Sequence, residues 1–110
     1  MALTYKGKTI ATDKEGYLKN LDDWCEDIAV LIADESHLVM STAHWEIIHA
    51  LRSFFREYQL SPSMRALVKY ISIHVDKDKG SSIYLLKLFP GNPAKVAARI
   101  AGLPKPNNCL

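Results

Sequence analysis

The sequence predicts a mainly α-helical protein. We expect a small orthogonal helical bundle with a helix-turn-helix-like core, a short N-terminal β-hairpin and an extended, mobile C-terminal arm. Apolar residues recur at helical spacing from about residue 22 to residue 101. Short alternating segments with glycine turns precede that region, and a proline-rich stretch without any period follows it. A chain of 110 residues has room for one domain around one core.

The N-terminal segment reads as short strands joined by tight turns. Leu3 and Tyr5 alternate with polar residues, and residues 6–8, Lys-Gly-Lys, provide a turn into a second short strand. A second turn follows at residues 14–16, where Gly16 can adopt a positive φ. These features predict a β-hairpin ahead of the helices.

Five helices are expected after the hairpin, each with a start or stop signal. Their predicted ranges are, in order, from 22 or 23 to about 33, from 41 to about 59, from 61 to about 75, from 81 or 82 to 89, and from 92 to about 101. Serine, asparagine or aspartate stands at each start as the N-cap. Proline follows Ser61 and Asn92 at the first helical position. Gly102 is placed to end the last helix.

We divide this single domain into a helical body, residues 1–101, and a C-terminal arm, residues 102–110. Pro104 and Pro106 favour an extended, polyproline-like path for the arm. Nine residues at about 3.3 Å each reach roughly 30 Å. Cys109 therefore lies near the tip of a semi-stiff segment.

Composition excludes several classes of function. The net charge is only +2, which is too small to indicate nucleic-acid binding by itself. No apolar run is long enough to span a membrane, and the first residues have no signal-peptide pattern. We therefore expect a cytoplasmic protein whose two cysteines stay reduced.

The two cysteines have different surroundings in the sequence. Cys25 is expected inside the first helix beside Trp24, where acidic neighbours oppose ionisation of the thiol. Cys109 is expected to be exposed, but the tail offers no base to activate it. A stand-alone thiol enzyme is therefore not predicted. A carrier that meets its activating group in a partner's site, or an incidental cysteine in a frayed end, both fit the residues.

The tail and four internal segments resemble one known family. The ending is RIAGLPKPNNCL, and the segments are GYL (16–18), HWEII (44–48), SPSMRALVK (61–69) and YLLKLFPGNPAK (84–95). Together they resemble the DsrC/TusE family over essentially all 110 residues, in a consistent order.

The resemblance implies that Cys109 carries sulfur as a persulfide between protein partners. Its thiolate would attack the terminal sulfur of a donor persulfide and later deliver that sulfur to an acceptor cysteine. Gly102 would be the pivot of the arm, Pro104 and Pro106 would stiffen it, and Lys105 would dock it or aid the thiolate. No cofactor other than the transient persulfide is expected.

One position indicates the branch of the family. In the DsrC branch a second arm cysteine stands eleven residues before the penultimate one, and here Ala98 occupies that place. The single-cysteine pattern resembles the TusE branch. That branch takes sulfur from a TusBCD-type complex through its TusD subunit. It works with an MnmA-type thiouridylase on the wobble uridine of tRNA, so the resemblance implies that tRNA is a partner only indirectly. A DsrC-like protein of sulfur metabolism stays the alternative, and alanine at position 98 also fits other single-cysteine members of the family whose role is unknown.

Other polar residues allow further readings. Arg65, Lys69, Lys95 and Arg99 could form a basic docking face for an acidic partner or for tRNA phosphates, although a solvated surface is the simpler reading. The predicted second and third helices also leave open a helix-turn-helix regulator that binds nucleic acid.

No metal site is predicted. His44 and His49 are five residues apart, a spacing that does not place two side chains on one helical face.

Overall fold

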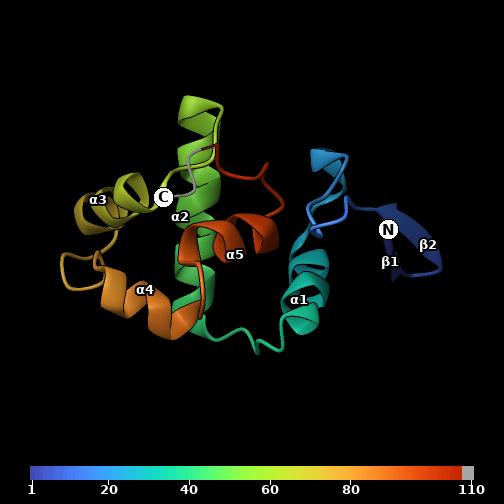
Figure 1. Cartoon of the computed structure of the whole chain (residues 1–110), viewed down its shortest axis with the longest axis horizontal. Helices are drawn as coiled ribbons and strands as arrows, with labels where there is room; N and C mark the ends of the chain where they lie inside the picture. The colour runs from blue at the N-terminus through green and yellow to red at the C-terminus, as the bar shows by residue number, and fades with distance from the viewer. Residues whose placement is uncertain (108–110) are drawn as a thin grey trace.

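The computed structural model describes residues 1–107 of the chain. The elements follow in the order β1 (Ala2–Tyr5), β2 (Lys8–Ala11), the 3-10 helix η1 (Leu21–Asp23), α1 (Glu26–Glu35), α2 (Thr42–Tyr58), α3 (Met64–His74), α4 (Ser82–Leu88) and α5 (Pro93–Ile100). Figure 1 shows α5 in the middle of the helical body, with the hairpin beyond α1 at one end. The predicted combination of a helical body and an N-terminal hairpin is confirmed for the described residues.

Helix α5 is the centre of the packing, because α1, α2, α3 and α4 all contact it. Most of its buried positions are small: Ala97 and Ala98 are fully buried, as is Ala101 just after the helix, and Ile100 is the large exception. Alanine side chains let neighbouring helices approach the α5 backbone closely. The larger core residues come mainly from the surrounding helices and include Ile28, Ile32, Ile47, Ile48, Leu51, Leu67, Ile71, Leu85 and Phe89.

The hairpin forms as predicted. Strands β1 and β2 are antiparallel, and Leu3 lies opposite Ile10 with both side chains buried. Lys6 and Gly7 have positive φ angles of 50° and 78°, which is the geometry of a tight hairpin turn. The Tyr5 hydroxyl donates a 2.6 Å hydrogen bond to Asp27 Oδ2, joining the hairpin to α1. That hydrogen bond is the main cause that raises the pKa of Tyr5 to about 12.

The first helix begins later than predicted. Asp22 and Asp23 belong to η1, which Asn20 caps, and α1 starts only at Glu26. Cys25 is the N-cap of α1 in an extended conformation, with no hydrogen bond from its side chain to the helix. The break between η1 and α1 places Trp24 outside both helices. There its indole contacts the end of α5, so a long-range contact accompanies the late helix start.

The third helix also begins later than predicted. Ser63, not Ser61, is its N-cap, and the Ser63 hydroxyl accepts a hydrogen bond from the Ala66 N–H at 3.3 Å. Ser61 is buried, and its hydroxyl donates to the carbonyl oxygen of Pro104 at 2.5 Å. The serine that the pattern assigns to a helix start is therefore used to contact the C-terminal segment.

The remaining helix signals are confirmed. Ser41 caps α2 in a capping box with His44, and Ser81 caps α4. Asn92 caps α5, with proline at its first position. None of the helices within residues 1–107 is long and apolar enough to cross a membrane.

Candidate functional site at the base of the C-terminal arm

The structure describes the first part of the predicted arm but not its tip. Cys109 lies outside the described residues, whereas Gly102, Pro104, Lys105 and Pro106 lie within them. We call residues 102–106 the arm base. Its contacts with the body determine where on the surface the chain stands just before the residues that lead to Cys109.

The arm base begins with a close contact between Gly102 and Trp24. Gly102 has a φ of +71°, and a Cβ placed on it would lie 2.2 Å from Trp24 Cδ1. The Trp24 indole N–H donates a 2.9 Å hydrogen bond to the carbonyl oxygen of Ile100. The N–H groups of Gly102 and Leu103 bond back to the carbonyls of Arg99 and Ala98, so glycine ends α5 as predicted.

Arg52 of α2 completes this contact. Its guanidinium carbon lies 3.8 Å from the centroid of the Trp24 ring, a cation–π geometry. Its Nη1 donates a 2.7 Å hydrogen bond to the carbonyl oxygen of Ala101. Burial, and secondarily the charge of Arg56, lower the pKa of Arg52, but a guanidinium stays protonated in proteins. A positive charge at the C-terminal end of α5 is also favourable for the helix dipole.

The next residues of the arm base lie against the body. Leu103 is only 3% exposed, and Pro106 is buried as well. Ser61 holds the Pro104 carbonyl, and Lys105 Nζ lies 3.0 Å from Glu15 Oε1. In Figure 1 this red segment turns back from α5 toward the end of α2 that precedes Ser61. Residues 102–106 therefore pack between the α2–α3 turn and the loop that contains Glu15.

The four predicted basic docking residues have different surroundings. Arg65 and Lys69 are exposed and stand one turn apart on α3, whereas Lys95 and Arg99 are only partly exposed on α5. Arg99 Nη2 donates to Ser36 Oγ at 2.5 Å, which ties the end of α5 to the end of α1. Their role in docking stays a prediction.

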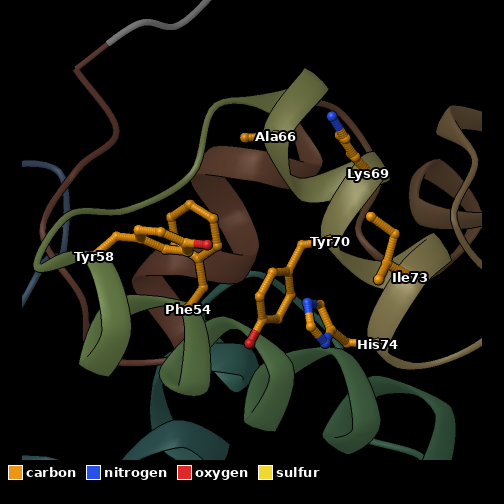
Figure 2. A pocket seen from close by; sticks show the side chains of 7 residues that line it. All are labelled: Phe54, Tyr58, Ala66, Lys69, Tyr70, Ile73 and His74. Atoms are coloured by element: carbon orange, nitrogen blue, oxygen red, sulfur yellow. The ribbon is translucent and has the colours of Figure 1, made fainter.

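A groove of about 240 Å³ lies beside Lys69, between α2 and α3. Figure 2 shows its lining, which consists of Phe54, Tyr58, Ala66, Lys69, Tyr70, Ile73 and His74. Tyr58 is 50% exposed and Ile73 is 65% exposed, so part of this aromatic lining faces solvent. Phe54, in contrast, is buried.

Two of the four histidines, His44 and His49, have polar side-chain partners. His44 Nδ1 lies 2.7 Å from Ser41 Oγ, and His44 Nε2 lies 2.7 Å from the Leu88 carbonyl. His49 pairs with Glu26 at 3.2 Å. No group of three or more metal-ligating side chains is found in the described part of the chain.

Sequence reasoning missed the residues that hold the arm base. Trp24, Arg52, Ser61 and Glu15 come from four separate segments and share no spacing that would group them. The sequence pattern marks Ser61 only as a helix start. The one signal available was the family-like segment at residues 61–69, which does not indicate what the serine contacts.

Both the helical body and the arm base fall within the span of one protein family. The family described as "DsrC like protein" matches residues 4–110, and the chain belongs to that family. The predicted family is therefore confirmed.

The similarity to known relatives and to solved structures extends over nearly the whole length of this chain. The chain is 47% identical over 108 residues to "Sulfurtransferase TusE" of Photorhabdus laumondii, covering 98% of this chain and 97% of that protein. It is 46% identical to "Sulfurtransferase TusE" of Escherichia coli K12, covering 98% and 99%. The solution structure of Allochromatium vinosum DsrC matches with a TM-score of 0.90 and 45% identity, covering 99% and 97%. The crystal structure of oxidised DsrC of Archaeoglobus fulgidus, the γ-subunit of dissimilatory sulfite reductase, matches with a TM-score of 0.87 and 38% identity. The match covers 100% of both chains. These matches do not favour the helix-turn-helix regulator.

Proposed function

We propose that this chain is a sulfur carrier of the TusE kind, which accepts a sulfur atom on Cys109 and passes it to a partner protein. The observation that supports this most directly is the 46–47% identity to proteins named Sulfurtransferase TusE over 108 residues. The span matched by the family, residues 4–110, includes Cys109. The packed arm base supports it further, because it gives a cysteine near the end of the chain a defined starting point.

The transfer needs no outside oxidant or reductant. The Cys109 thiolate attacks the terminal sulfur of a donor persulfide, forming a new S–S bond while the donor's S–S bond breaks and the donor thiolate leaves. Cys109 then carries the terminal sulfur as a persulfide. An acceptor thiolate attacks that sulfur in turn, and the Cys109 thiolate is released. Each step is an exchange whose rate depends on thiolate fraction and access.

The finer assignment is also our proposal. The donor is a TusBCD-type complex acting through its TusD subunit, and the acceptor is an MnmA-type thiouridylase that modifies tRNA in the cytoplasm. Ala98 supports this branch over a DsrC-like role in sulfur metabolism. Its side chain is fully buried in α5, and alanine there offers no second thiol to close a bridge with Cys109.

The proposed function predicts that the chain can be loaded and unloaded with sulfur. After incubation with a cysteine desulfurase, free cysteine and the TusBCD-type complex, the intact mass should rise by about 32 Da and return when a reductant is added. An MnmA-type enzyme with its tRNA should remove the same mass. If the donor complex is itself shown to be persulfidated and the chain gains no mass, the proposed function is wrong.

We also predict that Arg65 and Lys69 contribute to association with an acidic partner. Both are exposed on α3, and Lys69 lines the groove of Figure 2. Replacing both by glutamate should slow association with the donor complex roughly tenfold at low salt, and the difference should shrink as salt screens the charges. Stopped-flow or surface-binding kinetics at two salt concentrations would measure this.

The control for that prediction is the pair Lys8→Glu and Lys19→Glu. Both lysines are exposed and lie near the hairpin, and the pair changes the net charge by the same amount. Equal slowing by the two double variants would show that only net charge matters, and the location on α3 would be contradicted.

A further inference from the structure

We propose that Ser61 is a positioning residue for sulfur transfer. Its hydroxyl, with Glu15, holds the chain at Pro104 and Lys105, so that the last point of the chain fixed to the body before Cys109 is the end of the arm base rather than Gly102. This inference rests on the proposed role of Cys109 as the carrier. It assigns the function of a serine that the sequence pattern places at a helix start.

The position of Ser61 is fixed by its surroundings. The residue is 7% exposed, and the next residue, Pro62, is fully buried and has a restricted φ. Ser63 already caps α3, which leaves the Ser61 hydroxyl for the Pro104 carbonyl at 2.5 Å. A buried hydroxyl that loses its partner is costly, so this contact favours the packed position of the arm base.

The contacts before Pro104 make Gly102 a poor pivot. Gly102 is packed against Trp24, and Leu103 is 3% exposed with its N–H bonded to the Ala98 carbonyl. A swing about Gly102 would expose Leu103 and break the contacts of Ser61 and Glu15. The ion pair of Lys105 and Glu15 is half exposed, at 40% and 54%, so Ser61 is the stronger of the two contacts.

The last fixed point of the chain limits how far Cys109 can lie from the body. Cys109 is three residue steps after Pro106, so at about 3.3 Å per step it can lie no more than roughly 10 Å from Pro106. A pivot at Gly102 would allow seven residues and roughly 23 Å. A shorter tether confines the thiol near one place on the body and raises its effective concentration at the site of a docked partner. Ser61 should therefore affect the rate within the complex rather than the affinity of the complex.

The test compares Ser61→Ala with Ser63→Ala as a matched control. Sulfur transfer from the loaded chain to an MnmA-type acceptor is measured in a single turnover at increasing acceptor concentration. For Ser61→Ala we expect the maximal rate to fall about tenfold, with the half-saturating concentration unchanged. Alkylation of Cys109 by iodoacetamide should keep its wild-type rate, because a small reagent needs no positioned arm. Ser63→Ala removes a helix cap and should change neither rate.

Two outcomes would overturn the role of Ser61. One is a wild-type maximal rate in Ser61→Ala, and the other is an equal fall in transfer and alkylation, which would indicate altered thiol reactivity instead of positioning.

The hold on the arm can also be measured without any sulfur donor. Amide hydrogen exchange at Leu103, taken relative to the core amide of Ile71, should be several-fold faster in Ser61→Ala than in wild type or Ser63→Ala. An unchanged ratio would show that Ser61 does not hold the arm. If the ratio changes as expected while wild type never gains sulfur in the loading experiment, the proposed function fails and the hold on the arm stands.

Discussion

Replacing Cys109 by serine will abolish sulfur loading and leave the fold intact. Serine has no sulfur that can form a persulfide, so the gain of about 32 Da expected for wild type should be absent. Among the described residues the hydrophobic core cluster is made by side chains from Leu3 to Leu103, and we expect the free energy of unfolding to stay within about 0.5 kcal/mol of wild type. Intact-mass analysis and urea unfolding of the same preparation would measure both. Removing residues 109–110 should give the same pair of results.

The matched control is Cys25→Ser, which should load sulfur as wild type does. Cys25 is the N-cap of α1, and its thiol makes no hydrogen bond to the helix. Serine is a preferred N-cap, so the change should alter the free energy of unfolding by no more than about 1 kcal/mol, including a gain. A variant that folds normally and fails to load sulfur would place Cys25 in the relay. A folded Cys109→Ser protein that still gains reductant-sensitive mass would contradict the assignment of Cys109.

The helix ends show which features can be predicted from sequence alone. The caps Ser41, Ser81 and Asn92 were identified correctly, because a cap is a contact between a side chain and a backbone N–H only three residues away. Gly102 ends α5 as predicted through another local signal, because its φ of +71° is a conformation that glycine adopts without strain. Features of this kind depend only on residues that are close together in the sequence, and can therefore be predicted from it.

The two helix starts that the sequence misplaces depend on contacts between residues that are far apart in the chain. Ser61 looks like a cap followed by proline, but its partner, Pro104, is 43 residues away. The chain around Trp24 reads as a helix, but the indole bonds to Ile100, 76 residues away. Both errors occur where the body contacts the last turn of α5 or the arm base. Local propensity was overridden there by long-range contacts.

The candidate site, too, can be predicted from the sequence only in part. The residue that would carry sulfur follows from the tail motif, because the chemistry needs one thiol at one position. The residues that hold the tail do not follow from it. Arg52 lies within an ordinary amphipathic helix, and only the fold shows that its guanidinium reaches the Ala101 carbonyl and the Trp24 ring.

Gly102→Ala is expected to cause the largest loss of stability among single changes in the arm base. An L-residue at a φ of +71° costs roughly 1–2 kcal/mol. The added methyl would also lie 2.2 Å from Trp24 Cδ1 and 2.8 Å from its Cβ, and overpacking of this kind costs about 1–3 kcal/mol. We therefore expect the free energy of unfolding to fall by about 2–5 kcal/mol, measured by urea denaturation with an unchanged m-value.

Trp24 cannot relieve this overlap by a small rotation. Its indole is held by the hydrogen bond to Ile100 and by the guanidinium of Arg52, and the overlap includes its Cβ. Gly91→Ala separates the two costs, because Gly91 has a φ of +95° but nothing within 4 Å of an added Cβ. It should lose only the roughly 1–2 kcal/mol of backbone strain. Equal losses at both glycines would mean that the Trp24 contact contributes nothing, and the arm base would then be held by Ser61 and Leu103 without help from the end of α5.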